Sequence, residues 1–174
     1  MAGKERKTSP IRVLFVCLGN ICRSPMAEAL FQHYVQQEGL DAHIVADSCG
    51  TGNWHVGEPP CPGTRRVLAR HGISYRGRAR QITREDIREA DYVIAMDRDN
   101  VADLLWLDKD GHLDGKLHLL MEFAPEGSPE EVPDPYYEGN FEYVFSLVKP
   151  AVRGLLTHIK REDLGIEDET GGAS

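Results

Sequence analysis

The sequence contains no long apolar run and no excess of basic residues. No stretch approaches the roughly 18 to 20 uninterrupted apolar residues of a membrane-spanning helix, and the opening MAGKERKTSP lacks the apolar run of a signal peptide. With 20 basic and 28 acidic side chains the net charge is −8, which disfavours general attraction to nucleic acid or to an anionic membrane. We therefore expect a cytoplasmic protein with neither of these partners, in which an anionic ligand needs a local positive site.

Cysteine is also scarce. The four cysteines are Cys17, Cys22, Cys49 and Cys61, and a cytosolic chain of this length does not need a disulfide framework, so we expect reactive or buried thiols. A structural zinc site on Cys17 and Cys22 is disfavoured because no second ligand pair with suitable spacing follows. We expect no metal and no cofactor.

The length of 174 residues fits one ordinary domain. The composition, 41% hydrophobic and 28% charged, indicates a globular chain rather than a disordered one. We expect a flexible arm at 1–10, one domain at 11–161 and a flexible acidic tail at 162–174, where five acids stand without a base.

Short apolar runs alternate with segments of helical periodicity. The expected strands are 11–17, 42–48, 91–97 and 116–123. The expected helices are one that starts with Ser24 as N-cap and Pro25 as first residue, then 62–72, 83–90, 98–108 and 140–160, the last kinked or divided at Pro150. This alternation predicts an α/β sandwich on a mostly parallel sheet, whose ligands bind at the carboxyl ends of the strands.

The segment CLGNICRS, from Cys17 to Ser24, follows the first strand and leads into a helix. A short loop in that position can turn its backbone N–H groups inward as an anion-binding nest, and the helix N-terminus adds partial positive charge. The same donors would hold Cys17 as a thiolate, which is the nucleophilic form of cysteine. Arg23 supplies a planar fork that matches two phosphate oxygens. The pattern therefore predicts a phosphate-binding loop with Cys17 as nucleophile.

The remaining loop residues are candidates for substrate binding: Leu18, Gly19, Asn20, Ile21, Cys22 and Ser24. Gly19 permits close backbone approach, Asn20 tolerates a left-handed conformation, and Ser24 can donate a hydrogen bond to the sulfur. The competing interpretation is a core cysteine at a strand end, with Arg23 on a solvated helix start. The strand before the loop and the Ser-Pro pair after it favour the phosphate loop.

Cleavage of a phosphoester by a thiolate needs a proton donor for the departing oxygen. Asp134 is the candidate. It lies in VPDPYYEG, where prolines on both sides stiffen the loop and Tyr136 and Tyr137 can form aromatic walls. A turn aspartate without a catalytic role is the alternative.

The stretch VLFVCLGNICRSPMAEALF and the later DPYY resemble the low molecular weight protein tyrosine phosphatase family, over about residues 11 to 160. The resemblance implies a three-layer α/β sandwich, with a central four-stranded parallel sheet flanked by helices and the phosphate loop after the first strand. It implies Cys17 as nucleophile, Arg23 as phosphate clamp, Asn20 and Ser24 as supports, and Asp134 as general acid and then base. The partners implied are tyrosine-phosphorylated proteins, with a tyrosine kinase among the candidates, and the protein would be a monomer or weak dimer.

Two further segments bear on the resemblance. In DSCGTGNWHVGEPP, Ser48 resembles the family's loop-bracing serine and Trp54 an aromatic pocket wall, for which a half-buried structural tryptophan is the alternative. The family often has a histidine before RARQIT that bonds toward the loop serine, whereas this chain reads Ser74-Tyr75-Arg76-Gly77 there. That departure puts the bracing network in doubt.

Three alternatives compete with tyrosine phosphatase activity. Arsenate reductases of this fold use two later cysteines, and none follows Cys61. Protein arginine phosphatases resemble CTGNTCRS, with threonine where this chain has Ile21. A non-catalytic phosphate-binding module would share the loop but lack a working acid, which the presence of Asp134 disfavours.

The position of Cys22 in the same loop suggests redox control. Peroxide would convert Cys17 to a sulfenic acid that Cys22 captures as a disulfide. A small loop-packing residue is the alternative for Cys22. We expect Cys49 and Cys61 to be chemically inert.

Overall fold

The structure is a computed structural model that describes residues 9–167, apart from the side chains of Tyr137 and Glu138. The elements in chain order are β1 (Ile11–Cys17), α1 (Arg23–Gln37), β2 (Ile44–Gly50), α2 (Pro62–Arg70), α3 (Arg84–Glu89), β3 (Tyr92–Ala95), α4 (Arg98–Leu107), β4 (Leu117–Leu119), the 3₁₀ helix η1 (Leu120–Phe123), α5 (Pro135–Glu138) and α6 (Phe141–Asp163).

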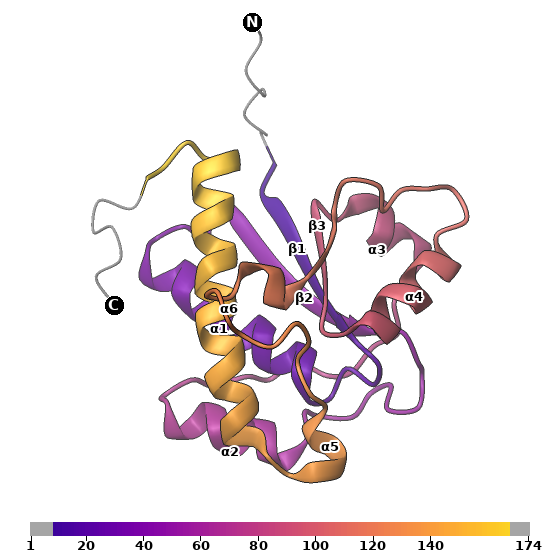
Figure 1. Ribbon diagram of the computed structural model, residues 1–174, viewed down its shortest axis with the longest axis vertical. Coiled ribbons are helices and arrows are strands. Elements are labelled where there is room, and N and C mark those ends of the chain that lie inside the picture. The colour runs from indigo at the N-terminus through magenta and orange to yellow at the C-terminus, as the bar shows by residue number, and fades with distance from the viewer. Residues whose placement is uncertain (1–8, 168–174) are drawn as a thin grey trace, which may run out of the picture.

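The four strands form one parallel sheet in the order β2-β1-β3-β4. The central strand β1 pairs with β2 from Ile11 opposite Ile44 to Cys17 opposite Gly50. In Figure 1, β1 runs from the top of the molecule down toward the region of α5. The carboxyl ends of the strands therefore share the lower edge of the sheet, where a ligand of an open α/β sheet is expected. This arrangement confirms the predicted fold.

Helices cover both faces of the sheet (Figure 1). Because side chains alternate along a strand, Val13, Phe15 and Cys17 face one buried cluster that includes α1, α2 and α6. The intervening Leu14 and Val16 face a second cluster, formed with α3 and α4. The side chain of Cys17 therefore lies on the α1 side of the sheet, at the end of the central strand.

Helix α1 begins two residues earlier than predicted. The N-cap is Cys22 rather than Ser24, and Pro25 is the third helical residue rather than the first. Proline is tolerated there because the first N–H groups of a helix have no partner within the helix. As a result Arg23 and Ser24 belong to the first turn of α1, which holds both side chains against the loop.

The later prediction of a strand at 116–123 also needs correction. Of the strand expected at 116–123 only Leu117–Leu119 forms. The next two residues, Leu120 and Met121, both pack in the buried cluster that includes α1, α2 and α6. Consecutive residues of a strand point to opposite faces of the sheet, so these two cannot continue the strand. Helix α6 is not divided at Pro150. Its apolar stripe, which includes Val148 and Val152 on either side of the proline, stays buried against the core.

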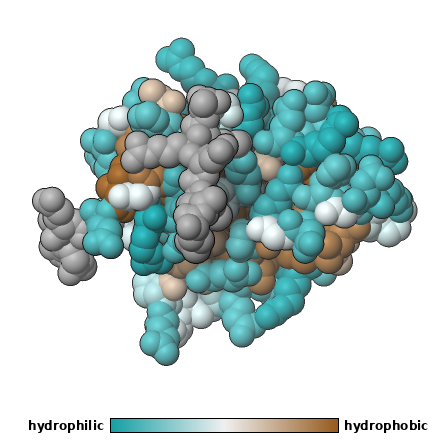
Figure 2. Space-filling model, turned by 90° about the horizontal axis from the view of Figure 1, so that it is seen from above, coloured by the Kyte–Doolittle hydropathy of each residue, from teal (hydrophilic) through white to brown (hydrophobic). Residues whose placement is uncertain are grey.

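The last turn of α6 contains residues 162 and 163, which we expected to belong to the tail, and the hydroxyl of Tyr92 donates a hydrogen bond to the carboxylate of Asp163. Residues 1–8 of the expected arm and 168–174 of the expected tail lie outside the described residues. Seen from the edge where the strands begin, most of the surface is hydrophilic, and apolar residues gather in a few patches (Figure 2). Within 9–167, no helix is long and apolar enough to span a membrane.

Candidate active site

The loop between β1 and α1 is held in an unusual conformation by Asn20. This residue has φ 57°, in the left-handed region that asparagine tolerates better than most residues. Its Nδ2 donates to the hydroxyls of Ser24 and Ser48, both at 2.9 Å, and its Oδ1 accepts from the backbone N–H of Arg80 at 2.9 Å. Three hydrogen bonds from one side chain therefore fix the loop.

The loop presents backbone donors. In the part of the chain that the structure describes, no protein acceptor takes a hydrogen bond from the N–H groups of residues 18 to 22. The positive N-terminus of α1 lies at the end of the same loop. This is the combination of features that binds a phosphate dianion.

The thiol of Cys17 is buried at the base of the loop, with Sγ 3.0 Å from the hydroxyl oxygen of Ser24. The Ser24 oxygen already accepts a hydrogen bond from Asn20. Its own proton is therefore free to point at the sulfur of Cys17.

Arg23 is nearly fully buried between two acids. Its Nη1 donates to Oδ2 of Asp97 at 2.6 Å and to the carbonyl oxygen of Val132 at 3.0 Å, and its Nη2 lies 3.6 Å from Oδ2 of Asp134. Burial alone would lower the pKa of Arg23, but the adjacent Cys17 and Asp97 outweigh it and raise the pKa above its usual value. The positive charge is therefore permanent.

Sequence reasoning did not find Asp97. Its position right after β3, at the carboxyl edge that also holds the loop, is the signal that was available. Asp97 is the N-cap of α4 as well, since its side chain accepts from the N–H of Asn100. The helix cap therefore positions the carboxylate that orients Arg23.

Asp134 lies across the site from the loop and caps α5, where its Oδ1 accepts from the N–H of Tyr136 at 3.0 Å. It shares a cavity of about 370 Å³ with the phosphate loop, lined by Cys17, Leu18, Gly19, Ile21, Cys22, Arg23, Trp54, His55, Asp134 and Tyr136. The fold thus brings the expected nucleophile, clamp and acid into one cavity.

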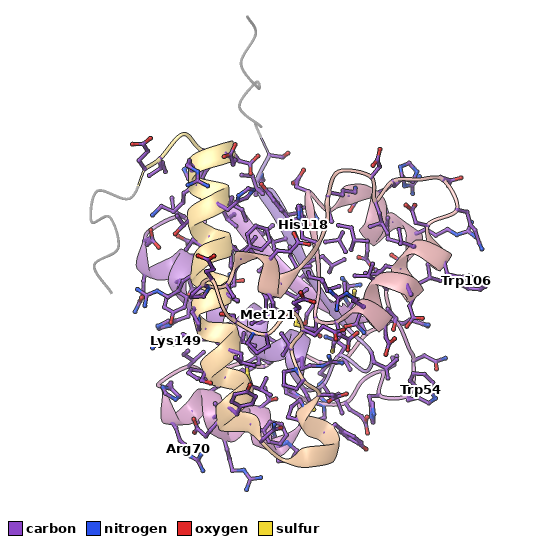
Figure 3. All side chains as sticks on the ribbon, viewed as in Figure 1. Trp54, Arg70, Trp106, His118, Met121 and Lys149 are labelled. Atoms are coloured by element: carbon purple, nitrogen blue, oxygen red, sulfur yellow. The ribbon has the colours of Figure 1, made fainter. Side chains whose placement is uncertain are left out.

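The rim of the cavity is aromatic. Trp54 is 70% exposed and Tyr136 54% exposed, and Trp54 projects outward from the loop after β2 (Figure 3). That exposure contradicts a half-buried structural role for Trp54. His55, which the sequence analysis missed although it adjoins Trp54, lies with its ring centre 5.9 Å from that of Tyr136. The side chain of Tyr137 lies outside the described residues.

A second hydrogen-bond chain supports the loop from behind. Ser48, which accepts from Asn20, donates to Oε1 of Glu28 at 2.6 Å, and the hydroxyl of Tyr75 donates to the same oxygen at 2.8 Å. Burial raises the pKa of Glu28, although these two hydrogen bonds offset part of the effect. The bracing network that the sequence put in doubt is present, with Tyr75 in it.

Gly77 leaves room for that tyrosine. A Cβ atom at position 77 would lie 2.1 Å from the hydroxyl oxygen of Tyr75 and 2.4 Å from its Cζ, distances at which atoms overlap. The glycine at position 77 and the position of the Tyr75 ring are therefore linked. Sequence reasoning missed Tyr75 and Glu28 because neither carries a recognisable motif.

The end of β2 closes against the loop through Gly50. A Cβ atom there would lie 2.7 Å from the carbonyl oxygen of Leu18. This close approach lets the N–H of Thr51 donate to the carbonyl of Cys17 at 3.0 Å, and that of Gly52 to the carbonyl of Leu18 at 2.9 Å. Glycine at position 50 therefore allows the end of β2, which contains Ser48, to pack directly against the residues that follow β1.

All four cysteines are free and buried. Cys22 lines the cavity and packs with Cys61 in one buried cluster. Cys61, which the sequence analysis set aside, therefore adjoins the loop. Cys49 packs in the opposite cluster, against α3 and α4.

Comparison with known proteins agrees with this geometry. A family model described as low molecular weight phosphotyrosine protein phosphatase matches residues 12–164. The curated low molecular weight protein-tyrosine-phosphatase YfkJ of Bacillus subtilis is 46% identical over 155 residues, which cover 87% of this chain and 97% of that protein.

Solved structures give the same result. The crystal structure of YfkJ from Bacillus subtilis superposes with a TM-score of 0.85 at 45% identity, covering 90% of this chain and 98% of that one. The crystal structure of DARP, a Drosophila arginine phosphatase, superposes with a TM-score of 0.80 at 32% identity, covering 86% and 98%. From the matched model and these relatives it follows that the chain belongs to the low molecular weight protein-tyrosine phosphatase family.

Proposed function

We propose that this protein hydrolyses phosphotyrosine in proteins, and small aryl phosphates, through a phosphocysteine intermediate on Cys17. The observation that carries the proposal is the single cavity in which Cys17, Arg23 and Asp134 meet. A nucleophile, a fixed positive fork and a carboxylic acid are the groups that this reaction requires.

In the first step the Cys17 thiolate attacks phosphorus in line with the aryl oxygen. The S–P bond forms while the P–O bond to the aryl group breaks, and Asp134 gives its proton to the departing phenol oxygen. Arg23 and the N–H groups of residues 18 to 22 hold the three remaining phosphate oxygens, where charge accumulates in the transition state.

In the second step Asp134, now ionised, removes a proton from water, and the water oxygen attacks phosphorus. The S–P bond breaks and the sulfur leaves as a thiolate, which the hydroxyl of Ser24 stabilises from 3.0 Å. Inorganic phosphate then departs. Because the loop and Arg23 already neutralise the phosphate oxygens, the reaction needs no metal.

The exposed rings of Trp54 and Tyr136 suit the substrate ring, since both stand at the rim of the cavity that contains Cys17. Aromatic side chains placed this way stack on or pack around an aryl group. We propose tyrosine-phosphorylated proteins as the partners, and a cytoplasmic location, where the reducing environment keeps a nucleophilic thiol active.

Arginine phosphatase activity is the second candidate, because the similar structure of DARP belongs to an arginine phosphatase. Ile21 lines the cavity at the position where the arginine-directed loop motif has threonine. An apolar side chain there favours an aryl group over a guanidinium. We expect kcat/KM for a phosphotyrosine peptide to exceed that for the matched phosphoarginine peptide, and the reverse order would overturn the choice.

Steady-state hydrolysis of p-nitrophenyl phosphate, with and without EDTA, tests the activity itself. Cys17→Ser should abolish turnover while phosphate binding, measured by calorimetry, persists. Asp134→Ala should lower kcat by roughly 10² to 10⁴, and the exposed Asp110→Ala serves as the matched control. Full activity in Cys17→Ser excludes the mechanism, and phosphate binding without turnover in the parent protein indicates the non-catalytic module instead.

A further inference from the structure

Two helices begin next to one another beside the phosphate loop, and each begins at a cysteine. Cys22 is the N-cap of α1 and Cys61 is the N-cap of α2. The N–H of Cys61 donates a 2.7 Å hydrogen bond to the carbonyl of Ile21, and both cysteines pack with Ile21 and Ala79 in one buried cluster. The backbone therefore keeps the two cysteines adjacent.

The side chains of the pair are in contact as well. Both side chains pack in the same buried cluster, and each thiol shifts the pKa of the other. The hydroxyl oxygen of Thr64 lies 3.2 Å from the sulfur of Cys61 and donates to the carbonyl oxygen of Cys22 at 3.1 Å. One threonine in the first turn of α2 thus ties both cysteines together.

The surroundings make the two sulfurs unequal. The neighbouring Cys22 thiol lowers the pKa of Cys61, which also lies at the positive end of α2. The Cys61 thiol and burial raise the pKa of Cys22. A thiolate held against a thiol is the pair that disulfide formation requires. Cys49 has no such partner in the described residues, and burial raises its pKa.

We propose that Cys22 and Cys61 form a dithiol that hydrogen peroxide oxidises to a Cys22–Cys61 disulfide. The Cys61 thiolate attacks one peroxide oxygen, the O–O bond breaks, and hydroxide leaves to take a proton from solvent, which gives a sulfenic acid on Cys61. The sulfur of Cys22 then attacks that of Cys61, the S–S bond forms, the S–O bond breaks, and the Cys22 proton leaves with the oxygen as water. Two thiols lose two electrons, which reduce one peroxide to two waters.

The geometry allows this reaction with small movements. Cys22 lines the cavity of about 370 Å³ that opens to solvent, which gives peroxide a route to the pair. The two side chains already pack in one buried cluster, and formation of the disulfide brings their sulfurs to about 2.0 Å. The bond would join the loop to the start of α2 and would leave Cys17 outside it.

This inference differs from the expectation that Cys22 captures an oxidised Cys17. The side chain of Cys17 packs in the cluster that includes α1, α2 and α6, with its sulfur 3.0 Å from the hydroxyl of Ser24, whereas Cys22 packs with Cys61 in a separate cluster. Cys22 can form only one disulfide at a time, so the Cys61 bond and the Cys17 bond exclude one another.

Peptide mass mapping distinguishes the two bonds without reference to activity. Trypsin places Cys17 and Cys22 together in peptide 13–23, and Cys49 and Cys61 together in peptide 24–65. After equimolar peroxide, alkylation and digestion, the proposal predicts a cross-linked pair of 13–23 with 24–65. A bond between Cys17 and Cys22 instead leaves 13–23 uncrosslinked and two hydrogens lighter.

Three variants assign the bond to its sulfurs. The cross-linked pair should persist in Cys17→Ser and in Cys49→Ala, and should fall at least tenfold in Cys61→Ser, whose basal phosphatase activity and melting temperature should match the parent. Loss of the cross-link in Cys17→Ser or Cys49→Ala, or its absence from the parent, overturns the proposal. Because the readout is a peptide mass in the folded full chain, failure of the proposed phosphatase activity would leave this result unaffected.

Discussion

The guanidinium of Arg23 is oriented by the carboxylate of Asp97, to which its Nη1 donates a 2.6 Å hydrogen bond. Both groups are largely buried, with side-chain exposures of 4% and 20%. The other nitrogen of the fork, Nη2, lies 3.6 Å from Asp134. Asp97 therefore anchors one nitrogen of the fork, while the other faces the proposed general acid.

Replacing Asp97→Asn should lower kcat for p-nitrophenyl phosphate about tenfold, equal to about 1.4 kcal/mol of transition-state stabilisation. Asparagine keeps the helix cap and a hydrogen-bond acceptor but removes the charge that holds Arg23. The exposed neighbour Asp99→Asn is the control, and steady-state kinetics with a thermal melt separates a site effect from unfolding. Equal kcat in the two variants would show that Asp97 does not orient the clamp.

The substitution Gly50→Ala should lower the activity by displacing the backbone of the phosphate loop. The added Cβ would lie 2.7 Å from the carbonyl oxygen of Leu18, so the loop must shift. A misplacement near 1 Å costs on the order of 10²-fold in rate, and we expect a fall in kcat/KM of about ten- to a hundredfold. Val45→Ala, at an exposed position of the same strand, controls for strand stability. Unchanged kinetics in Gly50→Ala would contradict the close approach.

The part of the site that could be predicted from the sequence is the part made of consecutive residues. Residues 17–24 combine a strand exit, a turn and a helix start, so their chemistry and geometry can be derived from one segment. Asp134 is far away in the chain, and it was found because prolines and tyrosines mark its loop. The alternation of strands and helices was sufficient to predict the fold class. The first residue of α1 and the conformation of residues 120–123 could not be predicted, because both depend on tertiary packing.

Asp97, Tyr75 and Cys61 could not be predicted because tertiary structure alone gives them their partners. Asp97 lies near the carboxyl end of β3, where ligands of such sheets bind, but this rule does not predict which residue at that edge faces Arg23. Tyr75 reaches Glu28 only because position 77 lacks a side chain. Cys61 reaches Cys22 only because α2 begins beside α1.

The dependence of Tyr75 on Gly77 can be measured with a double-mutant cycle. Gly77→Ala alone should displace the tyrosine ring, remove a hydrogen bond from Glu28 and lower the free energy of unfolding by about 1 to 3 kcal/mol. In a Tyr75→Ala background there is no tyrosine ring for the added methyl group to displace, so Gly77→Ala should hardly change the free energy of unfolding. Chemical denaturation of the four proteins gives the coupling energy. Additive effects would mean that the two positions act independently.

Glu28 should make the stability of the protein depend on pH. Burial raises its pKa in the folded state, while the unfolded chain has the ordinary value near 4.3. Folding therefore favours the protonated form. The corresponding stability is fully present below the unfolded pKa and is lost as the pH rises through the folded pKa.

Replacing Glu28→Gln removes that titration, since the amide stays neutral and its oxygen can still accept from Ser48 and Tyr75. Relative to the variant, the parent should lose stability as the pH rises from about 4 to 8, and the difference should level off above the folded pKa of Glu28. Urea unfolding at several pH values measures it, with the exposed Glu85→Gln as control. A difference that stays constant, or that changes in the opposite direction, would mean that folding does not raise the pKa of Glu28, and that the hydrogen bonds from Ser48 and Tyr75 outweigh its burial.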